Sequence, residues 1–230
     1  MIKIKILVYN PTYRRMEVYY RGLNEKMPYS KYITVKEFRG SSKTNVLWTD
    51  KRLMTSFNKL RATYGKPIKV GYGFKRIGEG GHTGMSQHYA GMALDMAQNL
   101  TSEQRDKLRN LAIKSGMFGY VEPKVLTPTW VHVDTRYPKP ACSRGGYPII
   151  KIGNKGVYVA VLQDALNQLG YNTGTIDGIF GRGTRSQVIR FQKANNLDSD
   201  GIVGCDTWEK LTKKALAKGS GLHEHTYEPE

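Results

Sequence analysis

The sequence predicts two folded domains, an α+β domain followed by a small all-α domain of three helices. The chain has 230 residues, which is long for one small domain and ample for two. Pro and Gly are dense between residues 136 and 156, where they interrupt both helical and strand patterns. Strand-like and helix-like stretches mix before this segment, whereas helical periods dominate after it. We therefore divide the chain into a first domain, a linker, a second domain and a polar tail, at residues 1–142, 143–151, 152–217 and 218–230.

The first domain begins with strand-like alternation over residues 1–40, around Tyr19, Tyr20 and Val35. A helix is predicted to follow Asp50, whose side chain can cap its first turn, and to end at Gly65. Between these two residues the large apolar side chains recur at helical spacing. Strands and helices therefore alternate from the start of this domain.

The rest of the first domain continues the mixture. Residues 68–73 have the composition of a strand, and Thr101 with Gln104 forms a capping-box pattern that opens a helix running to about Gly116. Two further strands are predicted over 118–121 and 129–133. An α+β domain with an antiparallel sheet accounts for this order of elements.

The second domain contains an internal repeat. Asp177 opens the sequence Asp-Gly-Ile-Phe-Gly and is followed by Thr184, and 23 residues later Asp200 opens Asp-Gly-Ile-Val-Gly and is followed by Thr207. Each unit is a glycine-bearing turn leading to a threonine that can cap a helix. With one helix in front of the repeat, we expect three helices, over 157–169, 184–194 and 206–217.

Composition excludes several classes of protein. Hydrophobic residues make up 39% and charged residues 24%, which permits a packed core and argues against wholesale disorder. Two cysteines, Cys142 and Cys205, exclude a disulfide-stapled mini-protein and a zinc ribbon; they either join the linker to the second domain or stay reduced. No apolar run approaches the ~20 residues that span a bilayer, and the N-terminus has the pattern of a strand rather than a signal peptide.

The positive charge is concentrated in the first domain. The chain carries +17 overall; residues 1–141 hold 25 basic and 10 acidic side chains, whereas residues 142–230 hold 11 and 9. A basic domain favours a polyanionic partner, which is nucleic acid, anionic lipid or an anionic cell-wall polymer. Charge alone leaves these three open.

Two short stretches carry the residues for metal chemistry. His88 and Asp95 lie seven residues apart with small residues between them, and His132 and Asp134 share one face of a predicted strand. Two histidines and one carboxylate suit a zinc site with three protein ligands and a fourth position for water. Zinc lowers the pKa of bound water to about 7, which provides a hydroxide nucleophile at neutral pH. The alternative is that one or both histidines are structural.

The pattern Ser-x-His-x-x-Gly-x-Ala-x-Asp over residues 86–95, followed by the apolar His-x-Asp stretch, makes the comparison specific. It resembles the zinc D-Ala-D-Ala carboxypeptidase and L-Ala-D-Glu endopeptidase family, which includes bacterial wall peptidases and phage endolysins and is distantly similar to the hedgehog fold. The resemblance covers roughly 65–136, whereas residues 1–40 are poorly matched. It implies a hedgehog-like α+β zinc peptidase fold, with one Zn²⁺ per chain held by His88, Asp95 and His132.

The same resemblance implies a cation upstream that binds a carbonyl or carboxylate of the peptide. Lys75 and Arg76 both follow the Gly-Tyr strand end, and we favour Arg76, as a catalytic and substrate-binding residue, because a planar guanidinium can grip a carboxylate with two hydrogen bonds. We also assign Ser86 and His82 to substrate binding, although His82 is equally consistent with a solvated loop residue.

The general base departs from the better-known family pattern. Some relatives have a glutamate three residues before the last zinc ligand, where this chain has Thr129. The remaining nearby carboxylates are Glu122 and Asp134. We assign the proton-transfer role to Glu122, and we expect Asp134 to assist catalysis by orienting His132.

The second domain resembles the three-helix peptidoglycan-binding module found beside wall hydrolases, over about 152–216. Together the two resemblances imply a peptidoglycan hydrolase that cuts a stem-peptide amide, at a D-alanine bond, as a carboxypeptidase or an endopeptidase. The alternative is a non-catalytic wall-binding protein with a structural or vestigial zinc site.

The expected partners and location follow from this interpretation. Peptidoglycan and anionic wall polymers replace nucleic acid as the expected partners of the basic domain, and we expect a monomer with no transmembrane segment. Because no signal peptide is recognised, we expect the protein to reach the wall on lysis, as phage endolysins do, or during a developmental process such as sporulation.

Overall fold

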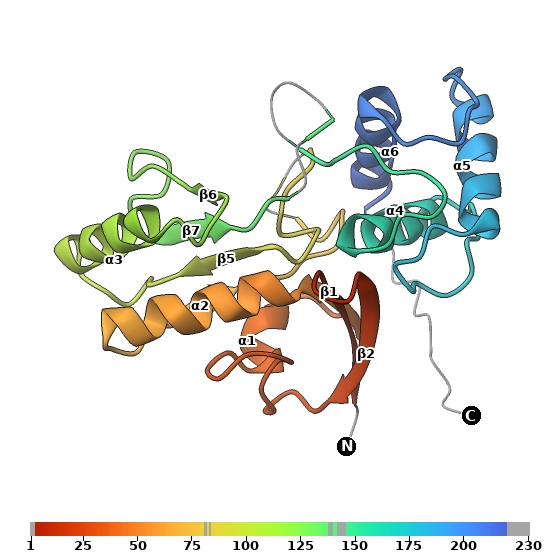
Figure 1. Cartoon of the computed structure of the whole chain (residues 1–230). Coiled ribbons are helices and arrows are strands. Elements are labelled where there is room, and N and C mark those ends of the chain that lie inside the picture. Colours follow the sequence, from red (N-terminus) through yellow and green to blue (C-terminus); the bar gives the residue numbers. More distant parts are fainter. Residues whose placement is uncertain (1–2, 81, 83, 138–139, 142–145, 220–230) are drawn as a thin grey trace.

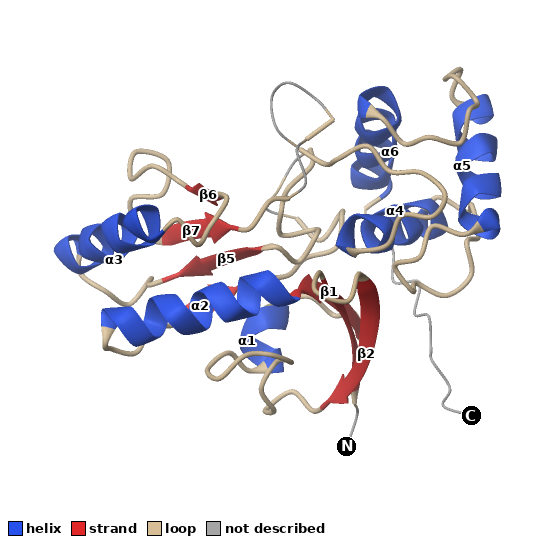
Figure 2. Ribbon diagram, in the orientation of Figure 1, coloured by secondary structure: helices blue, strands red, loops and turns tan. Residues whose placement is uncertain are grey.

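The structure is a computed structural model that describes all residues except 1–2, 81, 83, 138–139, 142–145 and 220–230. Over the described residues it is a mixed α/β structure with six helices and two sheets (Figures 1 and 2). The strands are β1 Ile4–Asn10, β2 Arg15–Arg21, β3 Val46–Asp50, β4 Val70–Tyr72, β5 Ala93–Met96, β6 Tyr120–Val121 and β7 Val131–Asp134. The helices are α1 Val35–Arg39, α2 Lys51–Tyr64, α3 Ser102–Ser115, α4 Val157–Gln168, α5 Arg182–Ala194 and α6 Cys205–Lys218.

The first sheet has the strand order β2-β1-β3, in which β1 pairs antiparallel with β2 and parallel with β3. The strand pattern expected over residues 1–40 is therefore correct for β1 and β2 and wrong at Val35. Val35 begins α1, because Thr34 and Glu37 form a complete capping box that satisfies the first backbone N–H groups of a helix. This local hydrogen bonding outweighs the β preference of a single valine.

The two longer helices of the first domain form where the caps predict them. The Asp50 side chain accepts a hydrogen bond from the backbone N–H of Arg52, and α2 ends at Gly65 in the left-handed conformation. Thr101 and Gln104 form the expected capping box at the start of α3, which ends at Gly116.

The second sheet has the order β4-β5-β7-β6 and is antiparallel throughout. The expected antiparallel sheet of the first domain is thus present. The more specific expectation of a hedgehog-like zinc peptidase fold stays a prediction.

The C-terminal helices α4–α6 gather at one end of the molecule (Figure 1), and each repeat turn is held by a buried glutamine. The side-chain oxygen of Gln163 on α4 accepts from the backbone of Asp177, and its nitrogen donates to the Thr184 hydroxyl. Gln192 on α5 repeats the arrangement with the Asp200 turn and Thr207. The repeat predicted from the sequence is therefore a repeated structural unit.

The expectation that the two threonines cap helices is wrong. Helices α5 and α6 begin one or two residues earlier, after Gly181 and Gly204, and neither has a side-chain cap. Thr184 and Thr207 lie inside the first turns, where their hydroxyls accept hydrogen bonds from the glutamines instead.

Helix α4 is buried on all sides except at Asn167. It packs against α5 and α6 and also against β3 of the first sheet. The buried apolar residues of both predicted domains belong to one continuous core. The division at 143–151 stays a prediction. The pairing of Cys142 with Cys205 also stays a prediction, since Cys142 and linker residues 143–145 lie outside the described residues.

None of the helices in the described ranges combines the length and apolar character that crossing a bilayer requires.

Candidate metal centre

The second sheet places four side chains in one row across its strands. Tyr72 on β4 is opposite Asp95 on β5, and Asp95 is opposite His132 on β7. The backbone N–H of Glu122, directly after β6, donates to the carbonyl of His132, which continues the row. Residues opposite one another in antiparallel strands project from the same face. The sheet register therefore brings Asp95 and His132 together with Glu122 beside them.

His88 joins this row from the turn before β5. Its Nε2 lies 3.3 Å from His132 Nδ1 and 3.4 Å from Asp95 Oδ1, and His132 Nδ1 lies 2.8 Å from Asp95 Oδ1. These three are the set of potential metal ligands found among the described residues. In a tetrahedral zinc site with bonds of about 2.0–2.1 Å, neighbouring ligand atoms are about 3.4 Å apart. The spacing and the nitrogen-and-oxygen donor set therefore fit Zn²⁺.

The other nitrogen of each histidine has its own acceptor. His88 Nδ1 lies 3.3 Å from the carbonyl oxygen of Gly73, and His132 Nε2 lies 3.5 Å from Asp134 Oδ2. Asp134 is fully buried and is gripped by Arg136, whose Nε donates to Oδ1 at 2.8 Å and whose Nη2 donates to Oδ2. Partners of this kind fix the orientation of metal-binding imidazoles. The expected role of Asp134 in orienting His132 agrees with this geometry.

The local charges favour an ionised carboxylate at the centre. Burial alone would raise the pKa of Asp95, but hydrogen bonds from His132 and His88 outweigh it and hold that pKa well below its usual range. Burial likewise opposes the charge on His132, whereas hydrogen bonds to Asp134 and Asp95 raise its pKa to about 9. Asp95 is therefore an ionised carboxylate, and His132 beside it carries the compensating positive charge.

The turn that carries His88 is fixed by close contact with the first sheet. Gly91 has a φ of +61°, and a Cβ there would lie 1.9 Å from the carbonyl oxygen of Trp48 on β3. The Trp48 indole donates to the Tyr89 carbonyl at 2.8 Å, and the Thr49 hydroxyl donates to the Gly91 carbonyl at 2.7 Å. Gly91, between His88 and Asp95, is therefore required by a close backbone approach.

His82 lies beside the centre, as expected for a residue near substrate. Its ring stacks on His88 with centroids 4.7 Å apart, and its Nε2 lies 2.7 Å from the Tyr72 hydroxyl. Burial, together with the neighbouring His88 and Lys75, lowers the pKa of His82 to about 4. Ser86 is also close, but its hydroxyl accepts from the backbone N–H of His88 at 3.3 Å. Their assignment to substrate binding stays a prediction.

The structure does not bring the Arg76 side chain to the centre. Its guanidinium is buried against Asp164 of α4, with Nη2 and Oδ1 2.6 Å apart. Lys75, the other cation considered, lies with its ammonium 5.1 Å from the centroid of the Tyr72 ring and 3.3 Å from the Gly80 carbonyl oxygen. Of the two cations, Lys75 is the one whose charge lies beside Tyr72 and acts on His82.

Among the carboxylates considered as general base, Glu122 is half-buried at the end of the row, while Asp134 is committed to Arg136. Thr129, at the position of the usual glutamate, is exposed and precedes β7. The prediction of Glu122 as the base is therefore compatible with the sheet register.

Sequence reasoning missed Tyr72 and Arg136. Tyr72 contacts His82 and His88, the two histidines that precede β5. The sequence could have indicated it, because Tyr72 lies in a predicted strand close to Lys75 and Arg76. Arg136 follows Asp134 at a spacing of two, which on an extended chain puts both on one face. The Gly73 carbonyl, a backbone acceptor, leaves no mark in a sequence.

Comparison with known proteins identifies the C-terminal domain. Residues 155–211 match the family described as a putative peptidoglycan binding domain. This confirms the resemblance expected for the second domain; the resemblance of the first domain to zinc carboxypeptidases stays a prediction.

Curated relatives share a similar segment. A spore cortex-lytic enzyme of Bacillus cereus is 38% identical over 65 residues, which are 28% of this chain and 25% of the relative. An N-acetylmuramoyl-L-alanine amidase, CwlL of Bacillus licheniformis, is 39% identical over 90 residues, which are 36% of this chain and 24% of the relative. The chain thus spans about a quarter of the length of these two relatives.

One solved structure is also similar in sequence, a peptidoglycan-binding protein from Clostridioides difficile in complex with glutamine hydroxamate. It is 42% identical to this chain, with 31% of this chain and 45% of that chain covered and a TM-score of 0.30.

Proposed function

We propose that the protein is a peptidoglycan hydrolase that uses zinc to cleave an amide of the stem peptide. The observation that carries the proposal is the convergence of His88, Asp95 and His132 in a chain whose residues 155–211 match a peptidoglycan-binding family. Relatives of that segment include a spore cortex-lytic enzyme and two amidases by name. Wall binding and a metal centre in one chain are best explained by wall cleavage.

His88, Asp95 and His132 would hold the metal. The contacts of His88 with the Gly73 carbonyl and of His132 with Asp134 would keep the ligand atoms aimed at it. When bound, zinc supplies a Lewis acid that polarises the amide carbonyl and lowers the pKa of a water molecule. Three protein ligands are the number that catalytic zinc sites use, whereas structural sites are closed by four.

The remaining steps fall to neighbouring side chains. Glu122, at the end of the row, takes the proton from the attacking water and returns it to the leaving amine. Lys75 provides positive charge near Tyr72 for the carboxylate or carbonyl of the peptide. We keep the predicted bond, an amide of D-alanine, and both carboxypeptidase and endopeptidase action as part of this proposal.

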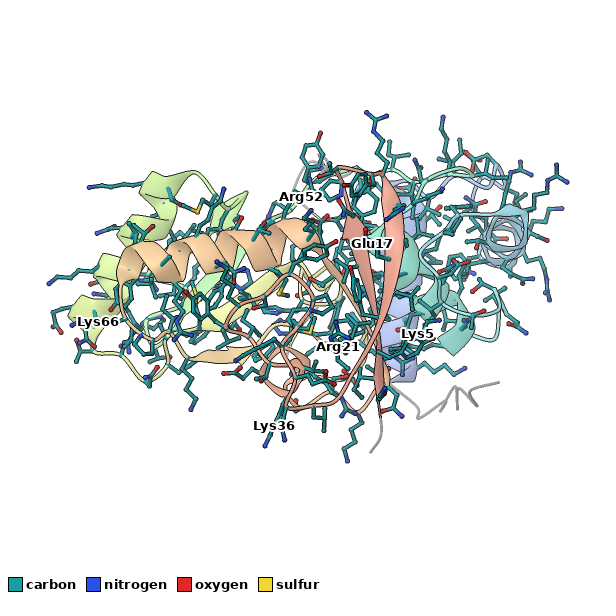
Figure 3. The ribbon with its side chains drawn as sticks, turned by 60° about the horizontal axis from the view of Figure 1, so that its bottom comes forward. Lys5, Glu17, Arg21, Lys36, Arg52 and Lys66 are labelled. Carbon is teal, nitrogen blue, oxygen red and sulfur yellow. The ribbon has the colours of Figure 1, made fainter. Side chains whose placement is uncertain are left out.

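The positive charge of the first domain supports the cell wall as the binding partner. Lys36 and Lys66 are exposed and point away from the body of the first domain (Figure 3), in keeping with its excess of basic side chains. Such a surface is attracted to peptidoglycan carboxylates and anionic wall polymers. We further propose that the protein acts at the wall during lysis or a developmental process, to which the cortex-lytic relative lends support.

The burial of the centre favours a second candidate, a wall-binding protein with a structural zinc site. His88 is 1% exposed and the Asp95 and His132 side chains are 7% and 14% exposed. The two candidates differ in whether purified peptidoglycan is cut.

The test is digestion of purified peptidoglycan by the zinc-loaded protein, with new termini identified by mass spectrometry. We expect new amino and carboxyl termini at one stem-peptide amide and none with the His132→Ala variant. Wall binding without new termini, in protein that holds one zinc per chain, would establish the second candidate instead. The position of the new termini decides between carboxypeptidase and endopeptidase action.

A further inference from the structure

The two residues before His88 are held by parts of the chain beyond residue 145. Gln87 is 5% exposed; its side-chain nitrogen donates to the Gly146 carbonyl at 3.1 Å and its oxygen accepts from the Tyr158 hydroxyl at 3.0 Å. Gly146 precedes the C-terminal domain and Tyr158 lies in the first turn of α4. The two polar ends of this buried amide are therefore satisfied by the linker and by the C-terminal domain.

Ser86 is held in the same way by a buried tyrosine. The hydroxyl of Tyr147, which is fully buried, donates to the Ser86 carbonyl at 2.6 Å. The Tyr147 ring packs between Tyr158, with centroids 5.2 Å apart, and Trp208 of α6, with centroids 5.0 Å apart. Tyr147 thus connects α4 and α6 to the backbone directly before the metal ligand.

An ion pair fixes the same interface a short distance away. Arg76 and Asp164 are 88 residues apart in the chain, and their side chains are 9% and 2% exposed. Arg76 Nε lies 3.1 Å from both carboxylate oxygens, and Gln168 donates to Asp164 at 2.8 Å. The backbone N–H of Lys75, next to Arg76, donates to the carbonyl of His88 at 3.3 Å. The pair therefore anchors α4 to the strand end that contacts the His88 backbone.

We propose that the peptidoglycan-binding domain is a fixed support of the metal centre and not a mobile anchor on a tether. In this arrangement Gln87, Tyr147 and Tyr158 are positioning residues that set where His88 points. The functional consequence of this inference rests on the proposed function, that is, on cleavage of peptidoglycan at the metal centre. A wall strand bound by α4–α6 would meet the metal centre at one set distance and orientation, so binding and cutting would select the same part of the polymer.

The test compares two hydroxyl deletions with a matched control. The double variant Tyr147→Phe/Tyr158→Phe removes the hydrogen bonds to Ser86 and Gln87 and keeps both rings. The control is Tyr171→Phe, at a tyrosine of the C-terminal domain whose ring packs on Phe191. Hydrogen–deuterium exchange of the metal-free chain reports on residues 84–92, and the absorption spectrum and dissociation constant of bound Co²⁺ report on the centre.

We expect faster exchange over 84–92 and about tenfold weaker Co²⁺ binding with an altered spectrum in the double variant, at the low end of the effects of losing outer contacts of a metal site. The control should match the parent chain, and all variants should sediment with purified walls alike. Unchanged exchange and an unchanged Co²⁺ spectrum would overturn the proposal, even if the unfolding midpoint falls. If the double variant does not fold, Tyr158→Phe alone is judged by the same criteria.

These readouts separate this inference from the proposed function. A parent chain that binds Co²⁺ but leaves peptidoglycan intact refutes the hydrolase, whereas the exchange and spectral comparison still decides the support of His88. Because exchange is measured without metal, it also decides the matter for a chain that takes up no ion.

Discussion

Replacing Asp164 with asparagine should lower the free energy of unfolding by about 3 kcal/mol. The substitution keeps the shape of the side chain but leaves the Arg76 side chain, which is 9% exposed, without the negative charge of Asp164. Removing one partner of a buried ion pair typically costs about 3–5 kcal/mol, and the remaining amide oxygen places this case at the lower end. Since domains are stable by only about 5–15 kcal/mol, the loss should be plain in a urea titration.

Two further variants make this measurement specific. Lys124→Gln breaks an exposed pair with Asp106, where the side chains are 52% and 37% exposed, and should cost less than about 1 kcal/mol. The double variant Arg76→Met/Asp164→Leu removes both charges and should recover most of the lost stability. A cost below about 1 kcal/mol for Asp164→Asn would refute the reasoning.

The same double variant tests the sequence-based role of Arg76. If Arg76 only joins the domains, the stable double variant should cleave peptidoglycan at close to the parent rate. If the variant is stable and holds normal zinc but has lost turnover, Arg76 has the substrate-binding role predicted from the sequence.

Four other outcomes follow from the site. His132→Ala should abolish stoichiometric zinc, measured by elemental analysis after dialysis; retained metal would remove it from the ligand set. At matched zinc occupancy, Glu122→Gln should lower turnover by about 10²–10⁴-fold, and Asp134→Asn by roughly 10–100-fold; the reverse order would exchange their roles. Lys75→Met should raise KM more than it lowers kcat, and an unchanged KM would exclude the proposed contact. Gly91→Ala should destabilise the fold strongly, because its Cβ meets the Trp48 carbonyl at 1.9 Å; an unchanged urea midpoint would contradict that contact.

That His88, Asp95 and His132 lie together was predictable because each residue is marked by its neighbours. The small residues between His88 and Asp95 mark a close backbone approach, and the two-residue spacing of His132 and Asp134 marks a strand face. The helix caps were predictable for the same reason, because Asp50 and Thr101 each accept a hydrogen bond from a backbone N–H within the next three residues. Where a feature depends on residues adjacent in the chain, the sequence was sufficient.

The remaining features depend on contacts between distant residues. Arg76 looked like a substrate-binding cation because its partner Asp164 is 88 residues away and looked like an ordinary helix residue. Thr184 looked like a helix cap because the glutamine that occupies its hydroxyl lies on the preceding helix, 21 residues earlier. Both errors arose from polar groups whose partners only the tertiary structure reveals.

The two buried glutamines of the C-terminal domain make each repeat turn depend on the helix that precedes it. Gln163 secures the turn that leads into α5, and α5 carries Gln192, which secures the turn that leads into α6. Damage at the first glutamine would therefore pass to both turns, whereas damage at the second would stop at the last helix. The position of the second turn therefore depends on that of the first turn, and the position of the first turn depends on α4.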